Sequence, residues 1–245
     1  MQAVLLFAEL WHQKGTDDGR KRPDRQGRAS MPEGNFFHYD QAAVDHLARK
    51  DKKLAAAMQA IGPVRREVMP DLFQALMHAI TGQQISMAAQ RTVWGRLCGL
   101  LGEVTPQALL AQPQTALQAL GLSARKVDYM RGIARQVVDG ELDLPGMAAL
   151  EDAEVCRRLA ALRGIGVWTA EMLLLFSLQR PDILSYDDLA IRRGLRMVYR
   201  HRSIDRALFE KYRRRYSPYG SVASLYLWAV SGGAIPELSD PAPKK

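Results

Sequence analysis

Apolar residues along the chain recur at the three- and four-residue spacing of an amphipathic helix. One apolar stripe consists of Leu72, Phe73, Leu76, Met77 and Ile80. The segment 85–101 continues this pattern, with Trp94 on its apolar side. After residue 36 no run alternates between apolar and polar positions as a half-buried strand would. The pattern therefore predicts an all-α chain of roughly ten short helices.

Polar residues and prolines mark where these helices begin and end. Thr105 and Ser123 each precede an apolar helical stretch, and a serine or threonine there caps the free N–H groups of a helix start. We expect Ser203 and Ser221 to cap the last two helices in the same way. Pro181 ends a long apolar helix, because the residue before a proline leaves the helical region.

A turn rich in glycine joins two of the predicted helices, 151–162 and 167–178. It reads Arg-Gly-Ile-Gly over 163–166. Glycine adopts the positive φ angle that a tight turn needs, and its lack of a side chain lets backbone N–H groups at a helix start approach a phosphate. The segment therefore predicts either a phosphate-binding hairpin or an ordinary pair of antiparallel helices.

The charge of the chain is unevenly distributed. The 245 residues include 34 Lys and Arg against 26 Asp and Glu, for a formal net charge of +8. Residues 192–215 hold ten basic side chains against Asp205 and Glu210, so this segment alone has a net charge of +8. Such a concentration favours an anionic partner, most often nucleic acid, over a basic surface that contacts only solvent.

Composition also excludes several classes of protein. Cys98 and Cys156 are too few for a disulfide framework, a four-thiolate zinc site or a four-cysteine iron–sulfur cluster. No apolar stretch approaches the about 18 residues of a membrane span. The chain start carries Glu9 and no basic region, which argues against a signal peptide. We expect a cytoplasmic protein of the bacterial cytosol or nucleoid, a disordered arm over 1–35, and Met31 as a second candidate start.

Four segments, in this order, resemble motifs of the helix-hairpin-helix DNA glycosylase superfamily. They are His78-Ala-Ile-Thr-Gly-Gln-Gln-Ile-Ser86, Gly121-Leu-Ser-Ala-Arg-Lys126, the hairpin Leu159-Ala-Ala-Leu-Arg-Gly-Ile-Gly-Val-Trp-Thr-Ala170, and Pro218-Tyr-Gly-Ser-Val-Ala-Ser-Leu-Tyr-Leu-Trp228. An aspartate follows the hairpin, as the family requires, within Tyr186-Asp-Asp-Leu-Ala-Ile-Arg-Arg-Gly194. The resemblance covers about residues 36–235.

The resemblance implies a division of the chain into two helical lobes with a catalytic cleft between them. Residues 36–70 plus 181–235 would form the lobe that carries the catalytic aspartate. Residues 71–180 would form the second lobe and end in the hairpin, and 236–245 would be a C-terminal tail.

Trp168 indicates which branch of the superfamily the chain resembles. Members that also cut the DNA strand have a lysine nucleophile at this hairpin position, and an indole cannot form a Schiff base. The resemblance therefore implies no lyase activity. Trp168-Thr169-Ala170 is similar to the alkylated-base branch, the 3-methyladenine DNA glycosylase II type, here in a compact form without an N-terminal β domain.

The resemblance implies that Asp188 is the catalytic residue. A carboxylate beside the deoxyribose either stabilises the positive charge that grows on the sugar or activates a water. Asp187 is the alternative if the register is shifted by one residue, and otherwise it caps the following helix.

Aromatic residues suit a pocket for a cationic, flipped-out base. The resemblance places Trp168, Tyr219 and Met172 in this pocket, Met172 standing where the family prototype has a tyrosine. Gly220 replaces the family's arginine after Tyr219. We interpret Trp228, like Trp94, as core packing.

The remaining expected contacts are with the DNA. Gln84 stands at the family's wedge position, where it would fill the gap left by the flipped base. Gly164, Gly166 and Thr169 would bind the DNA backbone. The carbonyl groups expected to hold a monovalent cation, Na⁺ or K⁺, are those of Ala160, Leu162 and Ile165. No other cofactor is expected.

The sequence thus predicts a monomeric, monofunctional DNA glycosylase that acts on alkylated purines such as 3-methyladenine and 7-methylguanine in double-stranded DNA. Two alternatives stay open. One is a glycosylase for deaminated or oxidised bases, and the other is a non-catalytic helix-hairpin-helix protein that only binds DNA.

Overall fold

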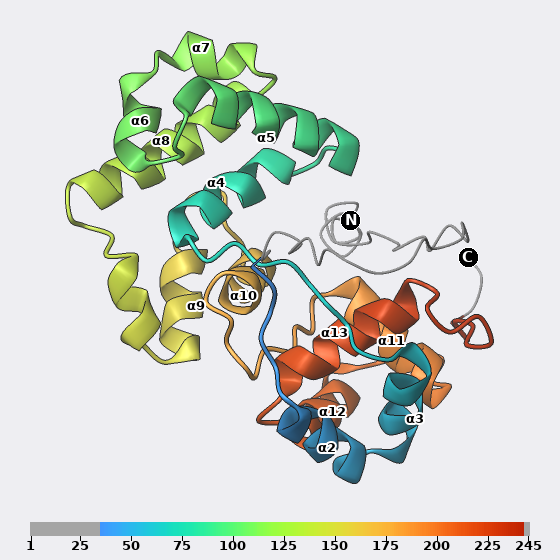
Figure 1. The fold of residues 1–245 in the computed structure, drawn as a ribbon. Helices are drawn as coiled ribbons and strands as arrows, with labels where there is room; N and C mark the ends of the chain where they lie inside the picture. The colour runs from blue at the N-terminus through green and yellow to red at the C-terminus, as the bar shows by residue number, and fades with distance from the viewer. Residues whose placement is uncertain (1–34, 243–245) are drawn as a thin grey trace, which may run out of the picture.

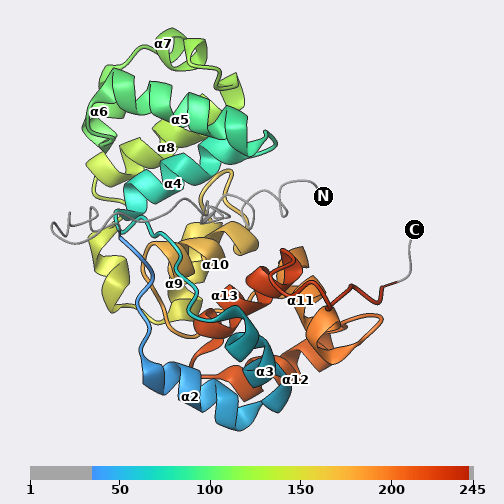
Figure 2. The same cartoon turned by 45° about the vertical axis from the view of Figure 1, so that its right-hand side comes forward.

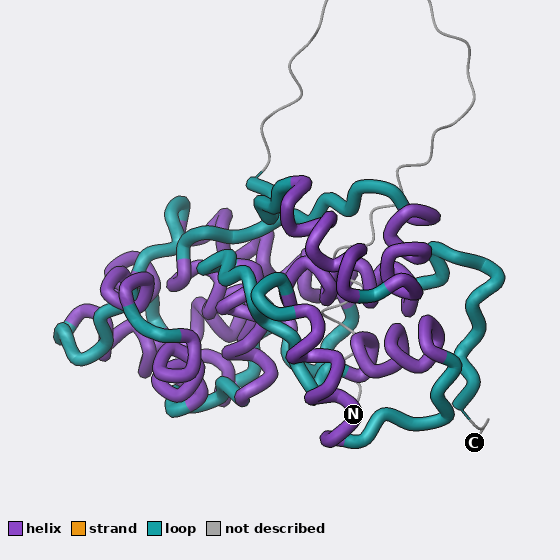
Figure 3. The backbone as a smooth tube through the Cα atoms, turned by 90° about the horizontal axis from the view of Figure 1, so that it is seen from below, coloured by secondary structure: helices purple, strands orange, loops and turns teal. Residues whose placement is uncertain are grey.

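The computed structural model describes residues 35–242. In this part of the chain the regular secondary structure is helical, and one isolated β-bridge joins Phe36 and Glu67. Its helices are α2 (Gln41–Lys50), α3 (Lys52–Ile61), α4 (Leu72–Gly82), α5 (Met87–Leu101), α6 (Pro106–Ala111), α7 (Gln114–Ala119), α8 (Ala124–Val138), α9 (Asp152–Ala160), α10 (Val167–Phe176), α11 (Leu189–Tyr199), α12 (Arg206–Tyr216) and α13 (Gly220–Ser231), with a short 3-10 helix at Pro145–Ala149. Figures 1 and 3 show the helices and the loops between them. The predicted all-α fold class is confirmed. The expected arm lies outside the described residues, except for Asn35.

No helix within residues 35–242 combines the length and the apolar character that crossing a membrane requires.

Most of the helices begin at a side chain that accepts a hydrogen bond from a free backbone N–H of the first turn. These caps are Asp40, Asp51, Asp71, Ser86, Thr105, Ser123, Asp188 and Asp205. Thr105 and Ser123 are confirmed as predicted. Of the two adjacent aspartates, Asp188 is the cap of α11, so the expected cap at Asp187 is wrong.

The predicted caps Ser203 and Ser221 are wrong. Asp205 caps α12 instead, and its Oδ1 accepts from Leu208 N at 2.8 Å. Helix α13 begins after Tyr219 without a side-chain cap. Ser221 lies inside α13 and is fully buried, where its hydroxyl accepts from Ile183 N at 2.9 Å. A buried serine hydroxyl can form a hydrogen bond with a backbone group of a neighbouring loop as readily as with one at a helix start.

The helices pack in two sets, which Figures 1 and 2 show one above the other. In the lower set, α13 packs against α11, α3, α12 and α2. In the upper set, α8 packs against α4, α6 and α7, while α4 also packs against α5. Helix α10 packs against α9 and α4, so the hairpin belongs to the upper set. The residue boundaries expected for the two lobes stay a prediction.

The contact between α11 and α13 depends on Gly194. A Cβ added at this position would overlap the backbone carbonyl of Leu227 on α13. The two helix backbones therefore lie closer together than any other residue at position 194 would permit. This close packing fixes the start of α11 relative to α13.

The loop between α10 and α11 is bound to α13 by buried serines. Besides the Ser221 bond to Ile183 N, Ser224 Oγ donates to Ile183 O at 2.9 Å. Ser221 and Ser224 are both fully buried. Because buried polar groups that find partners rigidify a structure, these bonds hold the loop that leads to Asp188.

The C-terminal tail is bound as far as Asp240. The Asp240 carboxylate accepts from Arg196 Nε at 2.8 Å and from Arg196 Nη2 at 2.5 Å. Arg193 lies 3.7 Å from the same carboxylate. Two residues of the basic segment 192–215 are therefore paired with an acid from outside that segment.

Candidate active site

Asp188 lies at the start of α11, where its side chain caps the helix. Its Oδ1 accepts a hydrogen bond from Ile191 N at 2.8 Å. Only 1% of the residue is exposed. A carboxylate so deeply buried needs further hydrogen-bond donors, because an unpaired buried charge is very costly.

Two indole N–H groups supply these donors. Trp168 Nε1 donates to Asp188 Oδ2 at 3.0 Å, and Trp228 Nε1 donates to Asp188 Oδ1 at 3.2 Å. Trp168 comes from the first turn of α10, and Trp228 comes from α13. The site thus joins the hairpin of the upper set to the helices of the lower set.

Trp228 is a residue of the site that the sequence interpretation missed. It is buried in the core, as expected, and its ring stacks on Phe176 with centroids 5.5 Å apart. The interpretation as core packing omitted its N–H group. A buried tryptophan usually places its N–H on an acceptor, and this rule would have pointed to a polar partner without identifying it.

Burial raises the pKa of Asp188 above its ordinary value of 3.8, because removal from water disfavours the charged form. Hydrogen bonds from Ile191, Trp168 and Trp228 act in the opposite direction and only partly offset this effect. The carboxylate is therefore a stronger base than an exposed aspartate. Asp187 is exposed.

A second carboxylate, Glu171, lies close to this site. It is on α10, one turn after Trp168, and Ser185 Oγ donates to its Oε2. Burial raises the pKa of Glu171, and the negative charges of Asp187 and Asp188 raise it further. The bond to Ser185 also ties the loop before Asp188 to α10.

Three of the four resemblance motifs meet at one cavity of about 570 Å³, which we call the motif cavity. Its lining includes the wedge-loop residues Gly82, Gln83, Gln84 and Ile85, the α8-start residues Gly121, Ser123, Arg125 and Lys126, and the hairpin residues Gly164, Gly166, Trp168 and Thr169. The side chain of Trp168 therefore lines the motif cavity and also binds the buried carboxylate of Asp188.

Hydrogen bonds connect the walls of the motif cavity. Gln83 Nε2 donates to Gly164 O at 2.7 Å, which ties the wedge loop to the hairpin turn. Lys126 Nζ donates to Thr81 O at 2.9 Å, which ties α8 to the end of α4. Next to Gln83, Gln84 has a φ of 59°, in the left-handed region that non-glycine residues seldom adopt.

The two hairpin glycines differ in the space around them. Gly164 has a φ of 88°, and a Cβ there would overlap the ring of Tyr129 on α8. Gly166 has an ordinary extended conformation with φ at −94°, and a Cβ there would meet nothing within 4 Å. Gly164 is required by the fold of the turn, whereas Gly166 leaves an open approach to the first turn of α10.

The remaining expected pocket residues do not line the motif cavity. Met172 is 1% exposed and belongs to the core, so the structure offers no surface of this side chain to a base. Tyr219 is half-buried, and its ring lies edge-on to His46 with centroids 5.2 Å apart.

The departure at Gly220 has a structural reason. Gly220 N donates to Asp182 Oδ1 at 3.0 Å, and a Cβ at position 220 would lie 2.8 Å from the same oxygen. The start of α13 therefore lies against Asp182, and the arginine of the family pattern would not fit there without a shift.

The expected cation ligands lie at the hairpin turn. Ala160 ends α9, and Leu162 O accepts from Ile165 N at 3.0 Å, which closes the turn. A carbonyl oxygen has two lone pairs, so this bond leaves Leu162 able to bind a cation. Within the described part of the chain no group of three His, Cys, Asp or Glu side chains is placed to hold a metal ion.

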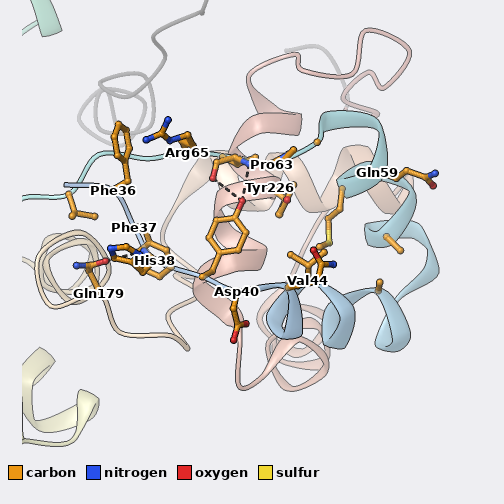
Figure 4. A pocket seen from close by; sticks show the side chains of 18 of the residues that line it. Phe36, Phe37, His38, Asp40, Val44, Gln59, Pro63, Arg65, Gln179 and Tyr226 are labelled. Carbon is orange, nitrogen blue, oxygen red and sulfur yellow. Dashed lines mark hydrogen bonds between the residues drawn. The ribbon is translucent and has the colours of Figure 1, made fainter. Parts of the chain in front are cut away.

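A second cavity, of about 1030 Å³, shares no lining residue with the motif cavity, and of the four motifs only the last reaches it, through Tyr226. Figure 4 shows labelled residues that line it, from the segment before α2, from α2 and α3, and from the loop after α3. His38 N donates to Gln179 Oε1 at 3.1 Å at its edge. None of the expected site residues lines this cavity.

Much of the basic segment 192–215 is paired. In addition to the Asp240 pairs, Arg213 binds Glu210 and Arg215 binds Asp51, both at 2.6 Å. The Arg192 guanidinium group lies over the ring of Tyr186, 4.9 Å from its centroid. Arg206 lies over the same ring at 4.7 Å and is also paired with Glu210 at 3.6 Å.

Comparison with known proteins agrees with this geometry. The family described as "HhH-GPD superfamily base excision DNA repair protein" matches residues 77–218. DNA-3-methyladenine glycosylase 1 of Schizosaccharomyces pombe is 30% identical over 194 residues, which cover 76% of this chain and 85% of that protein.

Solved structures show the same similarity. A DNA-3-methyladenine glycosidase from Bacillus halodurans is 33% identical, with a TM-score of 0.76 over 83% of this chain and 95% of that chain. A Schizosaccharomyces pombe 3-methyladenine DNA glycosylase in complex with abasic DNA is 29% identical, with a TM-score of 0.69 over 78% of this chain and 97% of that chain.

Proposed function

Because the chain belongs to the HhH-GPD superfamily of base excision DNA repair proteins, we propose that it is a monofunctional DNA glycosylase that hydrolyses the N-glycosidic bond of alkylated purines. The observation that carries this proposal is the buried carboxylate of Asp188, which the indole of Trp168 joins to the motif cavity. Relatives named for 3-methyladenine support the choice of alkylated bases.

The reaction needs little help for the departing base. Alkylation at a ring nitrogen leaves a purine positively charged, so it is already a good leaving group. What the enzyme supplies is a negative charge beside the sugar as positive charge develops there, or a base that activates the attacking water. Asp188 fits either role once the nucleotide has left the base stack and entered the cleft.

Trp168 has two proposed roles. Its ring lines the motif cavity, where the electron-rich face of an indole attracts a cationic base. It also occupies the position of the lysine nucleophile in strand-cutting members of the family. We therefore expect base removal that leaves an intact strand with an abasic site.

The proposed DNA contacts lie around the motif cavity. Gln84 would fill the space left in the duplex by the flipped base. Its backbone adopts the left-handed conformation, in the short loop between α4 and α5. Gly166 and Thr169 would bind a phosphate through backbone N–H groups at the start of α10, where the helix dipole favours negative charge. Gly164 would shape the turn that presents them.

We propose that the protein acts as a monomer. We also propose that a Na⁺ or K⁺ ion bound by the hairpin carbonyls of Ala160, Leu162 and Ile165 supports this phosphate contact. Replacing both ions with tetramethylammonium, which is too large for carbonyl ligands, would then weaken binding to a short duplex. Unchanged affinity would contradict the cation site.

The test of the proposed function is an analysis of products. Purified protein is incubated with duplex DNA methylated at purine nitrogens, and the released bases are separated and identified. We expect 3-methyladenine and 7-methylguanine to be released. We also expect strand breaks to occur only after alkali or heat.

Three results would contradict this proposal. Release confined to deaminated or oxidised bases would assign the site to another class of lesion. Binding of DNA without release of any base would make the chain a binding protein. Strand cutting without alkali or heat would contradict the role assigned to Trp168.

A further inference from the structure

Three hydrogen bonds to the Asp188 carboxylate are unequally divided between its two oxygens. Oδ1 accepts from Ile191 N and from Trp228 Nε1, whereas Oδ2 accepts from Trp168 Nε1. Each indole has a single N–H, so each can hold only one oxygen at a time. The two tryptophans therefore act on different oxygens of one carboxylate.

Trp228 is fixed in place on every side. It is 3% exposed, and its ring stacks on Phe176 with an interplanar angle of 24°. The helix that carries it is packed against α11 at the close contact between Gly194 and Leu227. Since α11 begins at Asp188, the donor and its acceptor belong to one rigid pair of helices.

Trp168 lies in a different setting. It is half-buried, at the first turn of α10, and its side chain borders the motif cavity. A nucleotide that entered from this cavity would meet Trp168 before it reached Asp188. The oxygen next to Trp168 is Oδ2.

We propose that Trp228 is a positioning residue for the reaction proposed above, and that its indole N–H, together with the Ile191 amide, holds Oδ1 so that Oδ2 is the oxygen turned toward the sugar. This inference rests on the proposed function. It assigns Trp228 no contact with DNA. Rotation of the carboxylate would exchange the two oxygens, and the two fixed donors on Oδ1 oppose that rotation.

Trp228→Phe is the direct test, because phenylalanine retains an aromatic ring for Phe176 and removes only the N–H group and part of the ring. A hydrogen bond to a charged group is worth about 1.5–3 kcal/mol, so we expect the single-turnover rate of base release to fall by about 10- to 100-fold. Affinity for a duplex that contains a tetrahydrofuran abasic analogue should stay within about twofold, since Trp228 does not face the cavity.

The pH profile distinguishes positioning from a general loss of structure. The Trp228 bond favours the ionised carboxylate, so its removal raises the pKa of Asp188. The acid side of the rate profile should then move to higher pH in Trp228→Phe. Trp94→Phe is the matched control: this half-buried tryptophan lies edge-on to His78, and we expect its profile to match wild type.

The outcomes separate the two proposals. If wild type releases methylated bases and Trp228→Phe matches it in both rate and pH profile, the positioning role is wrong. If wild type releases no methylated base, the proposed function fails, and the geometry around Asp188 is then tested by spectroscopy.

That spectroscopic measurement uses wild-type protein, so it holds even if Trp228→Phe fails to fold. The chain has four tryptophans, and Trp228→Phe or Trp168→Phe spectra assign the indole N–H resonances of ¹⁵N-labelled protein. We expect the Trp228 resonance to titrate with Asp188 and to stay in place when the abasic duplex is added, whereas the Trp168 resonance moves on addition. The inference is overturned if the chemical shift of the Trp228 resonance does not change as Asp188 titrates. It is also overturned if this resonance shifts on addition of DNA, as that of Trp168 is expected to do.

Discussion

Asp188 both begins a helix and supplies the buried carboxylate of the candidate site. The adjacent Asp187 is exposed, so burial distinguishes two residues that the sequence left as alternatives. The sequence could not identify Trp228 as a donor, because the contact joins residues 40 positions apart and no local pattern specifies it. The resemblance also placed Met172 in the base pocket, whereas the packing of α10 buries this side chain.

The raised pKa of Asp188 makes a prediction about stability. Between the ordinary pKa of 3.8 and the raised folded-state pKa, the folded protein binds more protons than the unfolded chain, so wild type loses stability as pH rises through this range. Asp188→Asn keeps a capping oxygen and has no such charge. The free energy of unfolding of the variant minus that of wild type should therefore increase with pH across this window and then level off.

Urea unfolding of both proteins at a series of pH values measures this difference. A difference that does not change with pH would mean that the pKa of Asp188 is the same in the folded and unfolded states. A decrease would mean that the folded-state pKa is lowered.

The hairpin shows how much an element's sequence reveals about its structure. The Gly-Ile-Gly turn and its flanking helices follow directly from the sequence, since Gly164 adopts a positive φ and Ile165 is buried. The open space at Gly166 and the bond from Gln83 to Gly164 come from packing between distant elements. The predicted cap at Ser221 was wrong for the same reason, because its hydroxyl accepts from Ile183 N in a loop distant in sequence. The predicted cap at Ser203 was wrong for a local reason, because Asp205 caps α12 instead.

The two hairpin glycines form a matched pair of variants. Gly164→Ala places a side chain in the left-handed region and against Tyr129, so we expect a loss of at least about 1–3 kcal/mol in the free energy of unfolding. Gly166→Ala should change stability by no more than about 0.5 kcal/mol, because its backbone is unstrained and the space is open.

DNA binding should show the opposite sensitivity at Gly166. A methyl group there would stand where we propose that the DNA backbone approaches, so affinity for a duplex should fall although the fold is intact. Thermal unfolding and fluorescence anisotropy measure the two effects. A Gly166→Ala variant with wild-type affinity would contradict the hairpin contact.

At the scale of the whole molecule, the net charge of the segment 192–215 overstates the positive electrostatic field that this segment presents to DNA. Asp240 and Asp51 lie outside this segment and pair with Arg196 and Arg215. A count of charges along the sequence cannot include partners that the fold brings from elsewhere. Arg192, which lies over the ring of Tyr186 two residues before Asp188, has a better position to meet a phosphate.

Arg192→Gln and Arg196→Gln test this distinction, because both remove one positive charge from α11. We expect Arg192→Gln to weaken binding to duplex DNA and to reduce the salt dependence of log Kd by about one unit of slope. Arg196→Gln should have a smaller effect, since Asp240 already neutralises this arginine. Equal losses in the two variants, measured by salt titration, would show that only total charge matters.

The most direct test of the whole proposal is the single-turnover rate of base release from methylated duplex DNA by Asp188→Asn, compared with Asp187→Asn. The two variants remove neighbouring carboxylates, one buried beside two indoles and the other exposed. We expect Asp188→Asn to lose at least about 100-fold in rate, with DNA affinity retained, and Asp187→Asn to stay within about threefold of wild type. An Asp188→Asn protein that releases methylated bases at the wild-type rate would contradict the central role of this carboxylate.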